Sequence, residues 1–315
     1  MIAQTEKKPV SKIRIPQFDL LGIDQLGAED ITAILDLAEY YVVQNRRRSQ
    51  THALLKGHVL VNLFLENSTR TRLSFDMAAK RLGAEVITMT TDGSSILKGE
   101  SFTDTLKTIN AMRPDIVVIR DRGEGSAEEA ALRIDCPVIN AGDGTREHPT
   151  QALLDALTLR RHFGRLEGLK IAIVGDILHS RVAHSNLHLL KKMGVTVSCV
   201  GPQELMPLGV DGMQDLQAGL KDADAVMVLR IQKERLTEKL SFTEAQYFDT
   251  YGLTEERLMM ANKNAVVLHP GPMNRGVEID AALADDPARS LITLQVEMGV
   301  AVRMACLDLL TRAAR

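Results

Sequence analysis

The sequence predicts an α/β protein of two domains, each a mainly parallel sheet flanked by helices. At 315 residues the chain is long for a single hydrophobic core, which favours two domains. Short apolar runs typical of buried strands alternate with helical patterns along the whole chain, as in parallel sheets covered by helices. A hydrophobic content of 45% and a charged content of 25% are those of an ordinary globular protein.

The first half of the chain predicts strands and helices in alternation. Strands are expected at His58–Leu65, Glu85–Met89, Asp115–Arg120 and Pro137–Asn140. Helices are expected at Leu20–Gln44, Ser74–Leu82, Ser101–Met112 and Ala127–Leu132. Between them, Gly93–Gly99 reads as a polar loop and Gly142-Asp143-Gly144 as a turn.

The second half repeats the alternation after a long helix, Thr150–His162, that is expected to lead into the second domain. Further strands are predicted at Lys170–Gly175, Val195–Val200, Ala225–Leu229 and Ala265–Leu268, and helices at Val182–Met193, Gln214–Lys221 and Leu291–Thr311. The polar segment Gln232–Gly252 shows few apolar anchors and is expected to move. We therefore predict domains at 1–149 and 150–292, with the last helix, about residues 293–315, packing back on the first domain.

Charge and cysteine content exclude several classes of protein. The formal net charge of -3 argues against a general nucleic-acid-binding protein, which is usually basic. Cys136, Cys199 and Cys306 are widely spaced without a C-x-x-C pattern, which favours a reducing compartment without disulfides or a zinc site. Met1–Pro16 lacks the apolar stretch of a signal peptide, and no apolar run is long enough to cross a bilayer. We expect a cytoplasmic protein.

The segment Ser68-Thr69-Arg70-Thr71-Arg72 lies where the first strand gives way to a helix. Amides at a helix start have no partner within the helix, and the helix dipole favours negative charge there. Arginine adds a planar fork that matches phosphate oxygens. Taken alone, the segment fits a Ser/Thr N-cap followed by two solvated arginines equally well.

Polar groups also follow five of the other predicted strands. In open α/β sheets, ligands bind outside the carboxyl ends of the strands. These strand ends carry five arginines, two histidines and two glutamines, namely Arg70, Arg72, Arg120, Arg181, Arg230, His148, His269, Gln151 and Gln232. The pattern predicts a small polyanionic ligand, with one phosphate and carboxylates.

Other kinds of site fit the sequence less well. Gly175-Asp176-Ile177-Leu178-His179-Ser180 follows a strand but has one glycine, against the G-x-G-x-x-G of nicotinamide enzymes, and no P-loop motif occurs. His184 and His188 stand four apart on a helix and lie near His179. Without H-E-x-x-H or a nearby carboxylate they read as helix-face residues, so no metal is expected. A G-x-S-x-G motif is absent, which argues against a serine nucleophile.

Four motifs together resemble the aspartate/ornithine carbamoyltransferase family. They are the segment Phe64–Phe75 (FLENSTRTRLSF), Lys98-Gly99-Glu100, the strand-end Arg120 and His148-Pro149-Thr150-Gln151. They occur in the family's order, and the resemblance runs from about residue 18 to the C-terminus. The segment Arg230–Arg235 (RIQKER) resembles the aspartate-binding R-x-Q-x-E-R of the aspartate branch. The D-x-W-x-S-M segment of the ornithine branch is missing, since the chain has no tryptophan.

The resemblance implies transfer of a carbamoyl group from carbamoyl phosphate to L-aspartate, an early step of pyrimidine biosynthesis, in a cleft between the two domains and without a cofactor. Its catalytic residues would be Arg70, Thr71, Lys98, Arg120 and His148. The phosphate would be held by Ser68, Thr69, Arg70 and Thr71, and the carbonyl oxygen by Thr71, Arg120 and His148. The carbamoyl amine would meet Gln151 and the backbone of the loop Pro270, Gly271 and Pro272.

The resemblance also implies binding of both aspartate carboxylates by Arg181, Arg230 and Gln232. Ser94 and Lys98 would come from a neighbouring subunit of a homotrimer, although Ser95 stands beside Ser94 and fits as well. Glu66 would pair with Arg181 and Arg235. Catalytic chains of this kind either stand alone as trimers or join regulatory or dihydroorotase partners.

Two other functions remain open at the level of the sequence. One is carbamoyl transfer to another amino acid, such as ornithine. The other is a non-catalytic anion-binding protein on the same fold, which would bind phosphate and form no carbamoyl product. The complete set of Arg70, Lys98, Arg120, His148 and Gln151 argues against the second.

Overall fold

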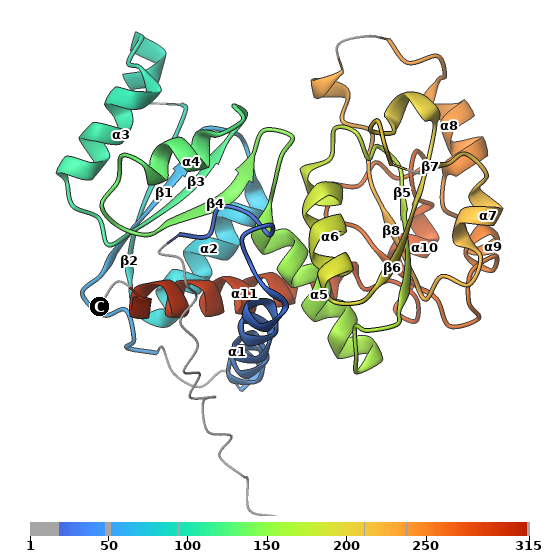
Figure 1. The fold of residues 1–315 in the computed structure, drawn as a ribbon, viewed down its shortest axis with the longest axis horizontal. Helices are drawn as coiled ribbons and strands as arrows, with labels where there is room; N and C mark the ends of the chain where they lie inside the picture. The colour runs from blue at the N-terminus through green and yellow to red at the C-terminus, as the bar shows by residue number, and fades with distance from the viewer. Residues whose placement is uncertain (1–18, 48–51, 93–94, 211, 237–238, 314–315) are drawn as a thin grey trace, which may run out of the picture. The chain divides into compact units, whose positions relative to one another are not determined.

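The computed structural model describes residues 19–47, 52–92, 95–210, 212–236 and 239–313 (Figure 1). These residues form two compact units, the first extending to Leu157 and resuming at Val296, the second running from Thr158 to Gln295. The chain leaves the first unit within helix α5 (Pro149–Phe163) and returns to it within α11 (Ile292–Ala313). The predicted limits, 149 and 292, lie at the first turns of these two helices. The segment Met1–Pro16 lies outside the described residues.

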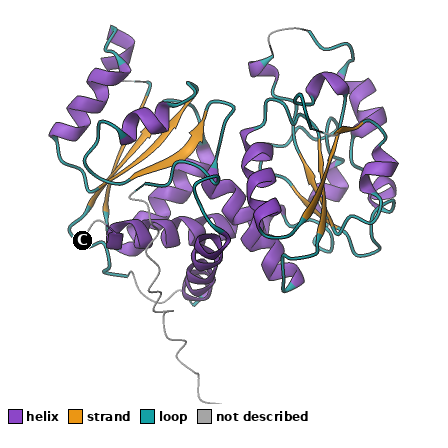
Figure 2. Cartoon of the chain, viewed as in Figure 1, coloured by secondary structure: helices purple, strands orange, loops and turns teal. Residues whose placement is uncertain are grey.

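The first unit holds a parallel sheet, drawn in orange in Figure 2. Its four strands follow the order β2-β1-β3-β4. Its strands are β1 (Val59–Phe64), β2 (Glu85–Thr90), β3 (Ile116–Asp121) and β4 (Val138–Asp143). Its other helices are α1 (Ala28–Arg46), α2 (Thr69–Leu82), α3 (Phe102–Ala111) and α4 (Ser126–Ala131), with a 3₁₀ helix at Ser95–Lys98. Side chains such as Leu63, Val117 and Val138 pack with α3 and α4 in a buried core, as expected of a sheet covered by helices.

The second unit holds a five-stranded parallel sheet in the order β7-β6-β5-β8-β9. Its strands are β5 (Lys170–Val174), β6 (Thr196–Val200), β7 (Gly212–Met213), β8 (Ala225–Val228) and β9 (Val266–Leu268). Its helices are α6 (Arg181–Lys192), α7 (Leu216–Leu220), α8 (Glu244–Tyr251), α9 (Glu255–Leu258) and α10 (Ala281–Asp285), with 3₁₀ helices at Gln203–Leu205 and Lys233–Arg235. Two parallel sheets flanked by helices confirm the predicted fold class.

Both sheets have a point where the strand order reverses. In the first unit the chain passes from β1 to β2 on one side and then to β3 and β4 on the other, so the reversal lies between β1 and β3. In the second unit it lies between β5 and β8 for the same reason. In sheets of this type, ligands usually bind at such a reversal point, where the loops leave two adjacent strands in opposite directions.

The helix expected from Leu20 begins later than predicted, at Ala28, after the extended N-cap residue Gly27. Leu20 instead extends the sheet beside β4. Its amide donates to the Val138 carbonyl at 2.9 Å, and its carbonyl accepts from the Asn140 amide at 2.9 Å. The helix is therefore shorter at its start than predicted, because Leu20 pairs with β4 and the Leu26 amide donates to the Ile23 carbonyl in a turn.

Two loop predictions also need correction. The predicted turn at Gly142-Asp143-Gly144 belongs in part to β4, which continues to Asp143. In the polar segment Gln232–Gly252, the prediction of few apolar anchors is wrong. The segment contains α8, whose Tyr247 and Tyr251 are buried, and Leu236, Leu240 and Phe242 pack on the same core. Widely spaced aromatic anchors among polar residues concealed this packing in the sequence.

Candidate active site

The reversal point of the first sheet carries the segment Ser68–Thr71. Ser68 follows β1 and is the extended N-cap residue of α2, yet its hydroxyl makes no capping hydrogen bond. The first turn of α2 holds no acidic side chain that would compensate its positive end. Thr69 and Arg70 are exposed there, whereas Thr71 is buried. The N-terminus of α2 is therefore arranged to receive an anion from solvent.

Thr71 lies beside His148, one of the other residues predicted from the sequence. The Thr71 Oγ1 and His148 Nε2 atoms are 3.5 Å apart, and both side chains are buried. Arg120 enters from β3, across the reversal point, where its Nη1 donates to the Ala141 carbonyl at 3.0 Å. The predicted groups of this unit thus come from the ends of β1, β3 and β4, which is the convergence that a parallel sheet produces.

Glu66 pairs with Arg120 of its own unit, a contact that the sequence did not predict. Its Oε1 accepts from Arg120 Nη2 at 3.0 Å, and both side chains are largely shielded from solvent. Arg120 lies in β3 opposite Phe64, the last residue of β1, and Glu66 follows Phe64 by two residues. A register between two predicted strands would have suggested this pair, but the sequence alone does not give the register.

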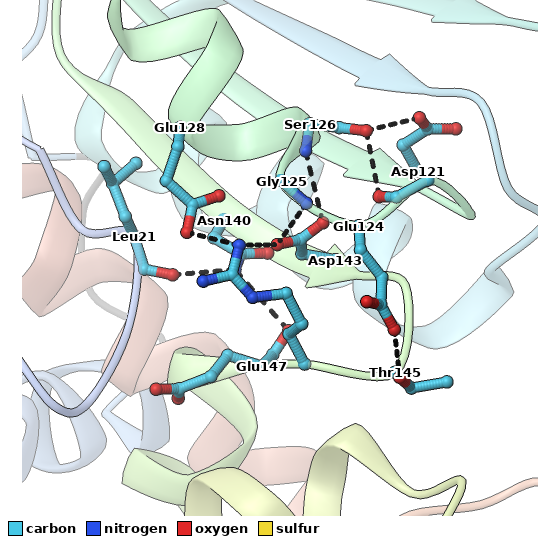
Figure 3. Close-up of polar contacts among 12 residues, drawn as sticks. Leu21, Asp121, Glu124, Gly125, Ser126, Glu128, Asn140, Asp143, Thr145 and Glu147 are labelled. Atoms are coloured by element: carbon cyan, nitrogen blue, oxygen red, sulfur yellow. Dashed lines mark hydrogen bonds and ion pairs between the residues drawn. The ribbon is translucent and has the colours of Figure 1, made fainter.

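The turn before His148 is anchored by a buried carboxylate, Asp143 (Figure 3). Its two oxygens accept from the backbone amides of Gly125 at 3.2 Å and Ser126 at 3.3 Å. Its own amide donates to the Glu147 carbonyl at 3.0 Å, which closes the turn directly before His148. Burial, with a smaller contribution from nearby Glu128, raises the pKa of Asp143 to about 6.

Further contacts tie the same turn to its surroundings. Arg146 pairs with Glu128 at 3.0 Å, and its amide donates to the Asp143 carbonyl at 2.9 Å. Both carboxylate oxygens of Glu147 accept from the Ile23 amide at 3.1 Å. His148 therefore follows a turn that is held from both sides, and this favours a fixed imidazole position.

Gln151 lies in the first turn of α5 with its amide oriented by Asp155. The Gln151 Nε2 atom donates to Asp155 Oδ1 at 2.9 Å, and both residues are buried. The donor end of the amide is thereby used, and the acceptor, Oε1, is the end turned away from Asp155. An amide so oriented suits a ligand that presents N–H groups.

The predicted residues of the loop Gly93–Gly99 are only partly described. Ser94 lies outside the described residues. Lys98 is exposed at the end of the 3₁₀ helix Ser95–Lys98, and Gly99 follows with a φ of 93°, a conformation that favours glycine. The lysine is thus presented on the surface of its own chain.

The reversal point of the second sheet is organised by Asp176, which follows β5 and is fully buried. Its carboxylate accepts from His179 Nδ1 at 2.9 Å and from the Gln232 amide at 3.0 Å. Gln232 follows β8, so this carboxylate joins the ends of two adjacent strands. The sequence reasoning placed Asp176 at a strand end but did not foresee this role.

The two arginines predicted to meet carboxylates lie in different settings within this unit. Arg181 is buried at the start of α6, which Ser180 caps by accepting from the Ala183 amide at 3.2 Å. Arg230 pairs through both terminal nitrogens with Glu234, one contact measuring 2.9 Å. The Arg230 guanidinium lowers the pKa of Glu234 to about 2, and the same hydrogen bond raises the pKa of Arg230.

The loop Pro270–Pro272 follows β9 and is held by the buried His269. The Gly271 amide donates to His269 Nδ1 at 2.8 Å. Gly271 adopts a φ of 65°, which a glycine tolerates without strain, and its peptide bond to Pro272 is cis. His269 was noted as a strand-end residue, but its contact with Gly271 was not predicted.

The described residues hold neither a metal-binding cluster nor a membrane-spanning helix. Within the described ranges, no three histidine, cysteine, aspartate or glutamate side chains gather as a metal site would require. None of the helices in the described part of the chain combines the length and apolar character that crossing a bilayer demands. Cys136, Cys199 and Cys306 are free thiols.

Fold and site together define a class: a protein of two parallel α/β units, each with cationic and hydrogen-bonding side chains at the reversal point of its sheet. Comparison with known proteins makes this specific. Residues 19–161 match the carbamoyl-P binding domain of aspartate/ornithine carbamoyltransferase, and residues 167–310 match its Asp/Orn binding domain. The chain belongs to the aspartate/ornithine carbamoyltransferase family, a family of carbamoyltransferase enzymes, as its motifs predicted.

Individual relatives point to the aspartate branch. The aspartate carbamoyltransferase catalytic subunit of Rhodospirillum centenum is 56% identical over 305 residues, covering 95% of this chain and 96% of the relative. The catalytic subunit of M. jannaschii aspartate transcarbamoylase is 37% identical, with a TM-score of 0.83 and coverage of 94% of this chain and 98% of that one. Aspartate transcarbamoylase of Trypanosoma cruzi in complex with carbamoyl aspartate and phosphate is 30% identical, with a TM-score of 0.86 and coverage of 94% and 97%.

Proposed function

We propose that the protein transfers the carbamoyl group of carbamoyl phosphate to the α-amine of L-aspartate, giving N-carbamoyl-L-aspartate and phosphate. This is an early step of de novo pyrimidine biosynthesis. The observation that carries the proposal is the uncompensated N-terminus of α2, with Ser68–Thr71 beside Arg120 and His148. The names of the relatives favour aspartate over ornithine as the second substrate.

Phosphate binding is assigned to the start of α2. The amides of its first turn, the hydroxyls of Ser68, Thr69 and Thr71, and the guanidinium of Arg70 would surround the phosphate oxygens. These oxygens gain negative charge as the bond to the carbamoyl group breaks. Arg70 would therefore stabilise the leaving group as well as the bound substrate.

The carbonyl oxygen is assigned to Thr71, Arg120 and His148. Attack by the amine turns this oxygen into an oxyanion, and donors aimed at it stabilise the transition state by roughly 3–4 kcal/mol each. The anchored turn before His148 supports this role, because such donors act only when they are already in position. Gln151 and the backbone of Pro270 and Gly271 would accept from the carbamoyl amine.

Aspartate is assigned to Arg181, Arg230 and Gln232, whose cationic and amide groups suit a substrate with two carboxylates. Carbamoyl phosphate is already activated, so no covalent enzyme intermediate is required, and catalysis would come from positioning and electrostatics. The departing phosphate can take the proton that the amine loses. The two substrates would thus be bound chiefly by the first and second predicted domains respectively.

We further propose a homotrimer in which Lys98, with Ser94 or Ser95, completes the phosphate pocket of a neighbouring subunit. The exposure of Lys98 at the end of a 3₁₀ helix supports this, because a lysine so placed can reach beyond its own chain. A regulatory or dihydroorotase partner could join such a trimer. The three free thiols support a location in the reducing cytoplasm.

A colorimetric assay for carbamoyl-aspartate on the purified protein tests the proposed function. We expect product with carbamoyl phosphate and L-aspartate, and none when ornithine replaces aspartate in a matching assay for citrulline. If product forms with ornithine and not with aspartate, the protein belongs to the ornithine branch of the family. Phosphate binding without any carbamoyl product would mean a non-catalytic anion-binding protein.

A further inference from the structure

A buried histidine and a buried glutamate lie directly behind the loop Pro270–Pro272. His269 is 2% exposed and Glu278 is fully buried. The His269 Nε2 atom lies 3.1 Å from Glu278 Oε1, and His269 Nδ1 accepts from the Gly271 amide at 2.8 Å. The His269 amide in turn donates to Gln295 Oε1 at 2.9 Å, which fixes the backbone from which the imidazole projects.

These contacts determine where the proton of the imidazole lies. Nδ1 faces an N–H group, so it must be the unprotonated, accepting nitrogen. Nε2 must then carry the proton, and this N–H donates a hydrogen bond to Glu278. A doubly protonated imidazole would set one N–H against another, so this environment requires the neutral ring.

The contact with Gly271 also sets the direction of a carbonyl group. The N–H of Gly271 and the C=O of Pro270 belong to one planar peptide unit and point in opposite directions. Because the N–H points at the imidazole, the Pro270 carbonyl points away from it. The position of His269 therefore decides where this acceptor is aimed.

Glu278 lacks a hydrogen-bond partner for one of its two buried oxygens, which is unfavourable for a residue that only stabilises the core. Its Oε1 accepts both from His269 and from the Asn274 amide at 2.6 Å, but its Oε2 is buried without a hydrogen-bond partner. A buried oxygen without a partner costs free energy that an apolar residue of similar size would avoid. Such a cost points to a role in holding the imidazole.

We propose that His269 is a positioning residue for carbamoyl transfer: as a neutral acceptor it holds the Gly271 amide and aims the Pro270 carbonyl at the carbamoyl nitrogen, and Glu278 fixes its tautomer. The role assigned to the Pro270 carbonyl rests on the proposed function. The tautomer and the contact with Gly271 do not.

The tautomer is tested by ¹⁵N NMR of histidine-labelled, full-length protein, with the His269 signals assigned by their loss in His269→Asn. We expect one unprotonated and one protonated ring nitrogen, unchanged as the pH is lowered from about 8 to about 5, the range in which an ordinary imidazole gains its second proton. A His269 ring that becomes doubly protonated within this range would overturn the proposal. The experiment needs no turnover, so its result is independent of the proposed function.

The positioning role is tested by steady-state kinetics of His269→Leu and His269→Asn. Leucine removes the acceptor, and asparagine offers its Oδ1 near the place of Nδ1. We expect His269→Leu to lower kcat/KM for carbamoyl phosphate about 10- to 100-fold, and His269→Asn to recover most of it, with a smaller change in the KM of aspartate. His188→Gln, on the exposed side of α6, is the matched control and should match the unaltered protein.

A second pair of variants keeps the proposal testable if His269→Leu does not fold. Glu278→Gln retains an oxygen for the Nε2 proton and should keep the tautomer and most of the activity, whereas Glu278→Leu should lose both. Equal kinetics for the two variants of either pair would overturn the positioning role. If the unaltered protein shows the expected tautomer but forms no carbamoyl-aspartate, the proposed function fails and the tautomer stands.

Discussion

The two groups of residues proposed to bind anions, one at the reversal point of each sheet, differ in how their charges are balanced. In the first unit, α2 begins without an acidic side chain, and the surrounding cations and donors come from adjacent strand ends. In the second unit, Arg230 is already paired with Glu234, and the buried Asp176 ties the neighbouring strand ends together. The start of α2 is an open site, since its first turn holds no acidic side chain, although Arg120 of the same unit pairs with Glu66. The second is a compensated site, because its Arg230 is paired with Glu234. A contiguous motif suffices for the first, while the second depends on acids spread along the chain.

The largest effect is expected at the open site. Arg70→Ala removes the guanidinium assigned to the phosphate, so kcat should fall by about 10²–10³-fold, the range seen when one donor to a transition-state charge is lost. Assay of carbamoyl-aspartate formation measures this. Arg122→Ala, at an exposed position, is the matched control. A near-normal rate for Arg70→Ala would contradict the assignment of the phosphate to this site.

Lys98→Gln tests whether the open site is completed by a second chain. We expect a loss of turnover comparable to that of Arg70→Ala, with an unchanged melting temperature, because the side chain is exposed in its own chain. Mixing Lys98→Gln and Arg70→Ala chains after reversible dissociation should restore activity, since some sites then receive both normal residues. Inactive hybrids would argue for a site within one subunit.

Glu234→Ala probes the compensated site. The paired carboxylate holds the Arg230 guanidinium in one plane, and its loss should raise the KM of aspartate about tenfold while the KM of carbamoyl phosphate stays the same. Varying each substrate in turn measures the two values. Glu255→Ala, an exposed acid on α9 of the same unit, should change neither. A rise in the KM of carbamoyl phosphate instead would contradict the division between the sites.

The turn before His148 is expected to affect folding stability rather than turnover, and its effect depends on pH. Because the pKa of Asp143 is raised from 3.8 to about 6, the folded protein binds this proton more tightly than the unfolded chain. The resulting stabilisation is complete below about pH 4 and is lost as the pH rises through about 6. Asp143→Asn cannot titrate, so its stability relative to the unaltered protein should rise by about 2–3 kcal/mol between pH 4 and pH 7. Urea unfolding across this range tests it, and a constant difference would contradict the assigned pKa.

The sequence predicted those parts of the molecule that depend on local pattern. Strands such as Val59–Phe64 and Lys170–Val174 are apolar throughout or nearly so, and each lies within two residues of its predicted limits. Leu20 was misread because its bonds to β4 join residues more than a hundred positions apart. No local pattern records such a pairing.

The candidate site divides in the same way. Ser68–Thr71 stand together in the sequence, and a strand-to-helix junction explains their chemistry. Glu278 stands apart from the motifs, and its contact with His269 depends on how the loop after β9 folds back. Acidic residues that orient functional side chains are therefore difficult to predict from the sequence, because their contacts depend on the fold.

Calorimetric titration with carbamoyl phosphate alone tests most directly whether the two sites bind different substrates. The unaltered protein and Arg230→Ala are expected to bind it with similar affinity, because Arg230 belongs to the compensated site. Arg70→Ala is expected to bind it at least tenfold more weakly. If both variants bind carbamoyl phosphate equally weakly, or if neither binds it more weakly than the unaltered protein, the assignment of carbamoyl phosphate to Ser68–Thr71 is contradicted.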